Sequence, residues 1–287
     1  MEKKMLLDVQ HLSIGFQSYN AKLEKITVQA IKDMSVQLNT GEILAIVGSS
    51  GSGKSLLAHA IMDILPDNAT VGGEIYYKGK KLDKSLINEL RGKSLCFIPQ
   101  SIAYLDPLMQ VGEQVRGIRG ESVRALQEKA FAHYNLKTGA DRLYPFQLSG
   151  GMARRVLLST AFVSESELII ADEPTPGLDL EIAVEALKDF RTMANEGKGV
   201  ILITHDIDLA LHVADKIAIF HDGRVIETAD TSCFTGTGEG LKHPYSQALF
   251  KALPQNGFVL KTCPRCGASS ATWNVDAKEM RCTCGNS

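Results

Sequence analysis

The chain has 287 residues and nearly balanced charge, with 31 Lys and Arg against 33 Asp and Glu and a formal net charge of −2 at pH 7. This length suffices for one large or two small domains that bury their own cores, which excludes a small disulfide-stapled scaffold. The balanced charge excludes an overall positive field that would draw the chain onto nucleic acid or an anionic membrane. A composition of 44% hydrophobic and 22% charged residues is typical of a folded globular protein.

Six cysteines are unevenly distributed along the chain. Cys96 and Cys233 stand alone, whereas the other four, Cys263, Cys266, Cys282 and Cys284, gather near the C-terminus. No apolar run approaches the roughly 18 residues of a membrane-spanning helix, and the N-terminus lacks the apolar segment of a signal peptide. We therefore expect the chain to stay in the cytoplasm, where clustered cysteines bind metal more often than they form disulfides.

Strands dominate the predicted N-terminal part of the chain. Half-buried strands are expected where apolar and polar residues alternate, and a fully buried strand where the run at 42–47 is almost entirely apolar. In chain order, we predict strands at 6–14, 28–38, 42–47, 73–77 and 94–99, a polar loop at 17–25 and a helix at 55–65.

A helical insertion then separates these strands from a second run of strands and helices. Apolar periodicity predicts that 112–136 and 148–163 are mainly helical. Beyond them we predict strands at 168–171, 200–203, 217–220 and 224–227, helices at 180–194 and 207–214, and a Gly/Thr/Ser-rich linker at 231–240. Alternating strands and helices predict an α/β fold.

The loop after the 42–47 strand matches the phosphate-binding pattern G-x-x-x-x-G-K-[ST]. It consists of Gly48, Ser49, Ser50, Gly51, Ser52, Gly53, Lys54 and Ser55. In such a loop, backbone N–H groups surround the β-phosphate, the lysine contacts the β- and γ-phosphates, and the serine hydroxyl is a ligand of Mg²⁺. A flexible linker of similar composition would not join a buried strand to the start of a helix, so we predict a nucleotide site.

An acidic pair, Asp172 and Glu173, directly follows the apolar run at 168–171. Ligands of α/β sheets bind at the carboxyl ends of the strands. Asp172 is therefore predicted to hold Mg²⁺ through water, and Glu173 to polarise the water that attacks the γ-phosphate. Such a pair alone would also suit a helix N-terminus, but the phosphate loop upstream favours the catalytic interpretation.

The segment Leu148-Ser149-Gly150-Gly151-Met152 resembles the signature motif of the ATP-binding cassette (ABC) ATPases. Further positions match that family's landmarks in the family's order. Gln100 resembles the Q-loop glutamine, Asp179 the D-loop aspartate and His205 the switch histidine, and Phe16 is the best match to the aromatic that stacks on adenine. The resemblance covers about residues 5–253.

The resemblance implies an ABC cassette, an α/β P-loop NTPase fold with a RecA-like core, an antiparallel β subdomain and a helical subdomain at about 102–163. Residues 254–287 would form a separate cysteine-rich extension. The cassette would bind ATP and Mg²⁺, with Ser55, Gln100 and Asp172 around the metal, and His205 on the γ-phosphate. Two cassettes would pair head to tail, so that Ser149, Gly150 and Gly151 complete the ATP site of the facing subunit, and Asp179 would also belong to the nucleotide site.

Three segments, 106–115, 144–152 and 243–254, look like those of the oligopeptide, dipeptide and nickel importer ATPases. Met152 replaces the usual signature glutamine, as in one of the two ATPases of those importers. The resemblance implies a heterodimer with a second cassette, two transmembrane permease subunits, an extracytoplasmic substrate-binding protein, and a place at the cytoplasmic face of the membrane. Arg154, where the family usually has glutamine, is a departure, and the cargo stays open between peptides and nickel or a metal chelate.

The alternative class is a soluble ABC ATPase that acts on DNA or ribosomes. The insertion is too short for a coiled-coil arm, and the chain has no Lys/Arg run and a net charge of −2, so we expect no nucleic-acid partner.

The C-terminal cysteines form two short pairs, Cys263/Cys266 and Cys282/Cys284, each followed by glycine. Four thiolates at this scale can close a tetrahedral zinc site, and the glycines ease the turns. The second pair is C-x-C rather than C-x-x-C, so a [4Fe-4S] cluster and free thiols remain alternatives to the predicted zinc.

Overall fold

A ten-stranded sheet forms the centre of the computed structural model, which describes residues 4–19, 23–236, 238–253, 271–274 and 279–282. The strands are β1 (Met5–Tyr19), β2 (Lys25–Asn39), β3 (Ile43–Val47), β4 (Ala69–Tyr77), β5 (Lys80–Lys81), β6 (Leu95–Ile98), β7 (Leu168–Asp172), β8 (Gly199–Thr204), β9 (Lys216–His221) and β10 (Arg224–Asp230). The helices are α1 (Ser55–Ile61), α2 (Lys84–Leu90), α3 (Val111–Arg116), α4 (Arg124–His133), α5 (Gly150–Val163), α6 (Leu180–Asn195), α7 (Ile207–Val213) and α8 (Pro244–Lys251). Across the sheet, neighbouring strands follow the order β5-β4-β1-β2-β10-β9-β3-β8-β7-β6.

Parallel strands make up one half of the sheet. β3 pairs in parallel with β8 and β9, and β7 pairs in parallel with β8 and β6. Every residue of β3, β7 and β8 is buried, because alternate side chains enter two different cores. Ile43 and Ala45 pack with α5, α6 and α7, whereas Leu44 and Ile46 pack with α1 and the antiparallel strands. This explains the continuous apolar runs from which these strands were predicted.

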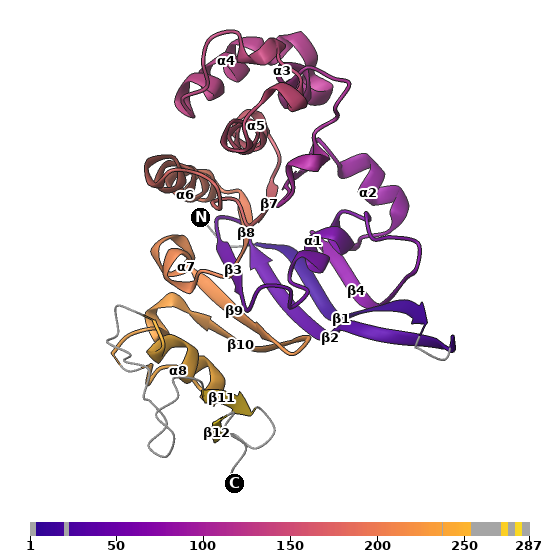
Figure 1. Ribbon diagram of the computed structural model, residues 1–287, viewed down its shortest axis with the longest axis vertical. Helices are drawn as coiled ribbons and strands as arrows, with labels where there is room; N and C mark the ends of the chain where they lie inside the picture. Colours follow the sequence, from indigo (N-terminus) through magenta and orange to yellow (C-terminus); the bar gives the residue numbers. More distant parts are fainter. Residues whose placement is uncertain (1–3, 20–22, 237, 254–270, 275–278, 283–287) are drawn as a thin grey trace.

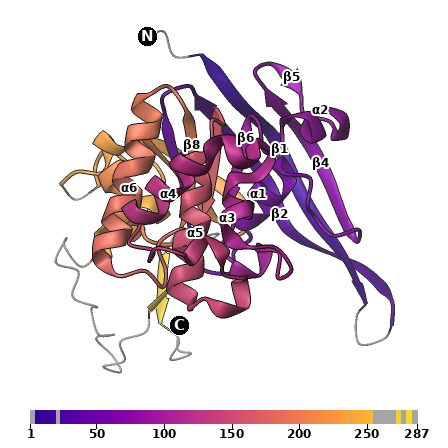
Figure 2. The same cartoon turned by 90° about the horizontal axis from the view of Figure 1, so that it is seen from above.

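The antiparallel half consists of β1, β2, β4 and β5, which lie on the side of the molecule away from α6 in Figure 2. β1 and β2 are longer than predicted, and the loop predicted at 17–25 is correspondingly shorter. Cross-strand pairs continue through Phe16↔Val28 to Tyr19↔Lys25. These outer residues are mostly exposed, so backbone pairing extends the strands where no burial pattern marks them.

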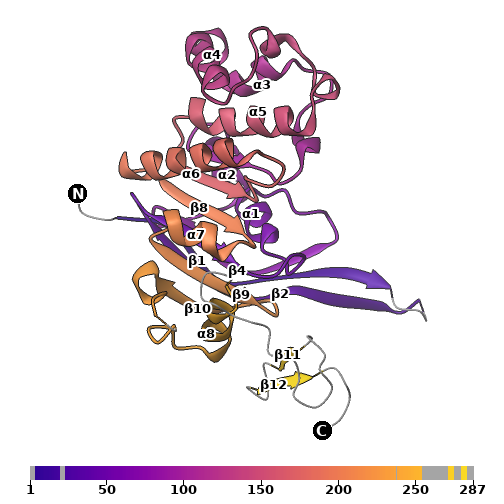
Figure 3. The same ribbon diagram turned by 60° about the vertical axis from the view of Figure 1, so that its left-hand side comes forward.

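The segment between β6 and β7 carries α3, α4 and α5, which gather at the end of the molecule opposite α8 (Figures 1 and 3). Residues 112–136, predicted to be mainly helical, lie largely in α3 and α4. The chain breaks at Gly117 and Gly120, whose φ angles of 53° and 54° lie in the left-handed region, and a 3-10 turn separates α3 from α4. The short α2, capped by the Asp83 side chain, was not predicted.

The predicted linker at 231–240 is anchored to the folded core through Phe234. A 3-10 turn spans Thr231–Cys233, and Phe234 and Leu241 are buried in the same cluster as Phe250 of α8. Cys96 is buried, as its strand position predicts.

A small antiparallel hairpin, β11 (Ala271–Asn274) and β12 (Glu279–Cys282), lies near the C-terminus. Cys263, Cys266 and Cys284 lie outside the described residues, and nothing is described of the Cys282 side chain, so the metal-site prediction stays a prediction. Within the described part of the chain, no helix is both long and apolar enough to span a membrane.

Candidate functional site

The carboxyl ends of β3, β7 and β8 meet at one edge of the sheet. Val47 lies opposite Thr204, and Asp172 lies opposite Ile203. The parallel register therefore places the start of the phosphate loop, the acidic pair and His205 next to one another, as the sequence predicts.

The phosphate loop is shaped by close packing at its start and by glycine conformations further along. A Cβ at Gly48 would lie 2.3 Å from the Phe220 carbonyl oxygen, and Gly53 has a φ of 102°, so neither position accepts another residue without strain. Ser49, Ser50 and Gly51 are exposed, which leaves the rim of the loop accessible.

Lys54 is buried beneath this loop. Its Nζ donates to the carbonyl oxygens of Gly48 and Ser49, at 2.9 and 2.8 Å. Burial lowers the pKa of Lys54, while the charges of Glu173 and Asp172 act in the opposite direction. The amino group is thus held at the loop, where the charges of two carboxylates oppose the lowering of its pKa by burial.

Asp172, at the end of β7, is 1% exposed and accepts a hydrogen bond from Ser55 Oγ at 3.1 Å. Burial raises the pKa of Asp172 to about 6; the Glu173 charge adds to this shift, and Ser55, Lys54 and Arg154 oppose it. A carboxylate and a hydroxyl are oxygen ligands of the kind that Mg²⁺ prefers. Ser52 Oγ in the same loop is buried without a hydrogen-bond partner among the described residues, as expected for a group that faces a ligand. These residues therefore fit Mg²⁺ and a phosphate group.

Glu173 and His205 form a second contact at the same edge. His205 Nδ1 lies 2.8 and 2.9 Å from the two carboxylate oxygens of Glu173. The Glu173 side chain is 8% exposed, whereas that of His205 is 55% exposed. Glu173 has a φ of 46°, unusual for a residue with a side chain, and its N–H donates to the Ile203 carbonyl at 2.9 Å. The backbone thus turns sharply to present this carboxylate beside Asp172.

The other predicted site residues lie around this edge without joining it. Gln100 is exposed just beyond β6, and Phe16 is half-buried in β1. Ser149 caps α5 by accepting the Met152 N–H, and the adjacent Gly150 is exposed. No hydrogen bond among the described residues links any of these to the phosphate loop.

Asp179, a further predicted site residue, caps α6. Its carboxylate accepts the Ile182 N–H and also pairs with Arg155 Nη2 at 2.6 Å. Within one chain, then, this aspartate is engaged with α5 and α6, and its predicted role at the nucleotide site remains a prediction.

Arg154, on α5, is a residue of the site that motif analysis did not assign. Its Nη1 donates to the carbonyl oxygens of Pro99 and Glu173, both at 3.3 Å. The only sequence signal was its departure from the glutamine that the family usually has at this position.

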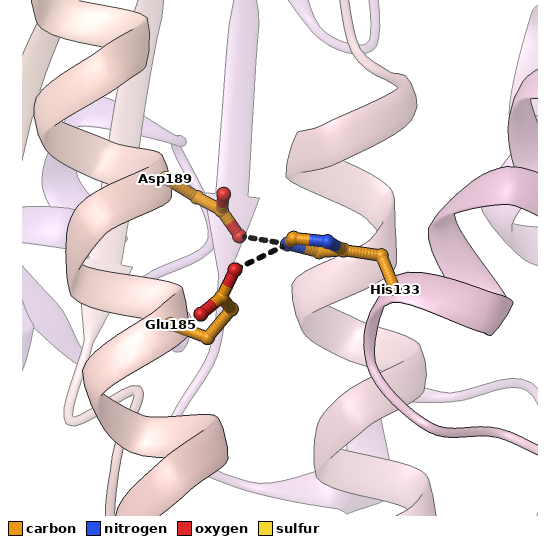
Figure 4. Close-up of side chains that lie close together, drawn as sticks. All are labelled: His133, Glu185 and Asp189. Carbon is orange, nitrogen blue, oxygen red and sulfur yellow. Dashed lines mark hydrogen bonds and ion pairs between the residues drawn. The ribbon is translucent and has the colours of Figure 1, made fainter.

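A second polar cluster joins α4 to α6 away from the phosphate loop (Figure 4). His133 Nε2 lies 2.8 Å from Asp189 Oδ2 and 3.7 Å from Glu185 Oε1. The Tyr134 hydroxyl donates to the same Asp189 oxygen at 2.6 Å, and the His133 ring packs against Phe162. No sequence pattern indicated this bridge, because its members come from distant helices.

The chain is similar in sequence to known transport proteins. The profile of the ABC transporter family matches residues 31–176. An oligopeptide transport ATP-binding protein of Bacillus subtilis is 33% identical over 87% of this chain and 72% of its own length. A dipeptide transport ATP-binding protein of the same organism is 33% identical over 89% of this chain and 78% of its own length.

Solved structures show the same fold. The dimeric bacterial ABC transporter cassette MJ0796 superposes with a TM-score of 0.68 at 26% identity, over 79% of this chain and 99% of that one. The same cassette in a post-hydrolysis state, bound to ADP and Pi, gives a TM-score of 0.67 at 26% identity over the same shares of the two chains.

Proposed function

The chain belongs to the ABC transporter family, and from this membership we propose that it is the ATP-hydrolysing subunit of a peptide importer. The observation that carries the proposal is the meeting of Lys54, Asp172 and Glu173 at one edge of the sheet, with His205 on the Glu173 carboxylate. An edge that joins a phosphate-binding loop to two carboxylates suits phosphoryl transfer to water.

In this proposal the backbone of the loop at 48–55 binds the ATP phosphates, and Lys54 exchanges its bonds to the Gly48 and Ser49 carbonyls for phosphate oxygens. Ser55 and Asp172 would hold Mg²⁺, with Gln100 completing the set. When bound, Mg²⁺ neutralises charge on the β- and γ-phosphates.

Glu173 is the proposed group that polarises the attacking water. Its carboxylate accepts a proton from that water, and the His205 imidazole fixes its orientation through Nδ1. Burial excludes bulk water from Glu173, while the exposed face of His205 is available to the γ-phosphate. Phe16 is the proposed adenine-stacking residue.

The helical segment at about 102–163 is the proposed contact with membrane permease subunits. Exposed apolar side chains follow Gln100, namely Ile102, Tyr104, Leu108 and Met109. Beside them lies a pocket of about 550 Å³ whose lining includes Phe97, Tyr104 and Leu105. An exposed apolar patch next to a pocket is typical of a protein interface.

Peptides are the proposed cargo, since the relatives are named for oligopeptide and dipeptide transport. These names favour peptides over nickel, and transport over action on DNA or ribosomes. Two permease subunits, a substrate-binding protein and a second cassette complete the proposed assembly, in which the chain lies at the cytoplasmic face of the membrane. The exposed Ser149 and Gly150 are available to that second cassette, and Asp179 would join them in the interface.

The proposed division of the chain is an ABC domain at 5–253 and an extension at 254–287. The four cysteines of the extension are proposed to bind zinc, on the chemistry of their spacing alone. One zinc per chain by elemental analysis is the expected result; bound iron with broad visible absorption would instead identify an iron–sulfur cluster.

Replacement of Glu173 tests the proposed function. Glu173→Gln keeps the shape of the side chain but cannot accept a proton from water, so ATP hydrolysis is expected to fall at least about hundredfold. ATP binding, measured by calorimetry, is expected to persist. Undiminished turnover in the variant would refute the role of Glu173, and loss of binding would show that the residue serves nucleotide affinity instead.

Uptake measurements test the cargo. Cells that lack this chain are expected to lose uptake of labelled di- and oligopeptides, and the wild-type chain, but not Glu173→Gln, should restore it. Normal peptide uptake together with lost nickel uptake would overturn the peptide assignment.

A further inference from the structure

Arg154 is a charged side chain at the nucleotide edge to which the proposed mechanism gives no role. From near the start of α5, its Nη1 lies 3.3 Å from the Pro99 carbonyl and 3.3 Å from the Glu173 carbonyl. Pro99 directly precedes Gln100. One guanidinium group therefore joins α5 to the segments that directly follow β6 and β7.

Partial burial and two neighbouring carboxylates distinguish Arg154 from an ordinary solvent-exposed arginine. The residue is only partly exposed, and burial lowers its pKa while the Asp172 and Glu173 carboxylates act in the opposite direction. Arginine stays protonated in proteins, so this is a fixed positive charge beside the acidic pair. Glutamine at this position would offer a shorter side chain, fewer donors and no charge.

The backbone of Glu173 explains why such a contact matters. A residue with a side chain keeps a positive φ only where its surroundings hold it there. The Glu173 N–H is held by the Ile203 carbonyl of β8, and its carbonyl is held by Arg154. The sheet thus fixes one backbone polar group of Glu173, and α5 fixes the other.

We propose that Arg154 is a positioning residue that ties Glu173 and the Gln100 segment to α5. The helix that Ser149 caps and the carboxylate of Glu173 then move together, and a partner that binds at Ser149–Gly151 acts on the water-polarising group through this contact. The proposal rests on the proposed function for the role of Glu173, but the contact can be tested without turnover.

Hydrogen exchange in the full-length chain tests the contact directly. Arg154→Met removes both hydrogen bonds, and amide exchange is expected to rise at least about fivefold in peptides covering 97–104 and 170–178. Exchange in the 48–55 loop should stay unchanged. Arg154→Lys keeps a charged donor and should preserve most of the protection, and Arg154→Gln, with a neutral donor, should fall between them.

Arg119→Met is the matched control. Arg119 also donates to a backbone carbonyl at α5, that of Val163 at 3.1 Å, but at the far end of the helix. Its loss should leave exchange at 97–104 and 170–178 unchanged. Equal exchange in the wild type and Arg154→Met, or a rise spread evenly over the whole chain, would overturn the proposal; if Arg154→Met does not fold, the lysine and glutamine variants decide by the same criterion.

Kinetics in the assembly that hydrolyses ATP provide the second readout. Turnover per bound nucleotide is expected to fall at least about tenfold in Arg154→Met with KM changed less than about twofold, and Arg154→Lys should recover most of it. A rise in KM at constant kcat would assign Arg154 to nucleotide affinity and overturn the positioning role. A wild-type chain without ATPase activity would refute the proposed function, while the exchange results would still decide the contact.

Discussion

The nucleotide edge of the sheet and the helical segment at 102–163 are held in place by different forces. At the edge, the functional residues follow strands that are buried on both faces and bonded to neighbours on both sides. In the helical segment, α3 and α4 pack on α5, and α5 packs on β6. Polar side chains supply further links, such as His133 to Asp189 and Arg154 to Glu173.

This difference indicates which part can move. Displacing a strand of the parallel sheet would break backbone hydrogen bonds, whereas α3, α4 and α5 are held through side chains, most of them apolar residues buried in the core that they share with the sheet. The chemistry lies on the rigid part, and the surfaces proposed to meet partners lie on the part with weaker links.

The largest expected effect comes from the rigid edge. Lys54→Ala removes the buried ammonium at the phosphate loop, so ATP affinity is expected to fall by roughly hundredfold or more, since charge-assisted bonds to phosphate are the strong ones. Calorimetric titration with ATP measures this. Lys198→Ala is the control, because Lys198 also donates to a backbone carbonyl, that of Ser164 at 3.0 Å, outside the site. Equal losses in both variants would contradict a specific role for Lys54.

Burying the Asp172 carboxylate at this edge costs free energy, and this cost is expected to make the stability of the fold depend on pH. Folding raises the pKa of Asp172 from 3.8 to about 6, so the folded chain binds this proton more tightly than the unfolded chain. The buried charge therefore destabilises the fold above pH 6, and this loss is recovered as the pH falls from about 6 towards 4. Asp172→Asn lacks the titrating group.

Thermal unfolding of both proteins between pH 4.5 and 7.5, without Mg²⁺, checks this. The melting temperature of the wild type is expected to rise relative to that of Asp172→Asn as the pH is lowered through 6. A constant difference between the two proteins would contradict the raised pKa.

The contrast between the nucleotide edge and the helical segment also explains which features of the fold and the site the sequence predicts. The loop at 48–55 and the pair Asp172-Glu173 are contiguous motifs, and the buried strands before them are visible as apolar runs. His205 was assigned from the resemblance to the ABC ATPases, and its contact with Glu173 was not predicted; the contact arises because β7 and β8 pair in parallel with their carboxyl ends side by side. Contiguous motifs were enough to predict the loop and the acidic pair.

Tertiary contacts decided what the sequence did not predict. The break between α3 and α4 depends on two glycines that a helical periodicity tolerates, and the exposed outer parts of β1 and β2 extend because each pairs with the other. The bridges made by Arg154 and His133 join helices to distant parts of the chain. A single sequence has no pattern for such contacts.

The smallest expected effect tests the weaker links. His133→Gln removes the imidazole that bridges α4 to Asp189, at a site where the His133 side chain is 26% and the Asp189 side chain 15% exposed. A partly buried hydrogen bond to a carboxylate contributes on the order of 1 kcal/mol, so the melting temperature is expected to fall by a few degrees, with ATP affinity unchanged. Arg124→Ala is the control: its pairs with Glu121 and Glu128 are exposed, and its third pair, with Asp141, is long at 3.7 Å, so the melting temperature is expected to change less than in His133→Gln. If His133→Gln were no more destabilising than Arg124→Ala, the bridge would not be one of the links that hold the helical segment. If His133→Gln also weakened ATP binding, the helical segment and the nucleotide edge would be coupled more tightly than their contacts indicate.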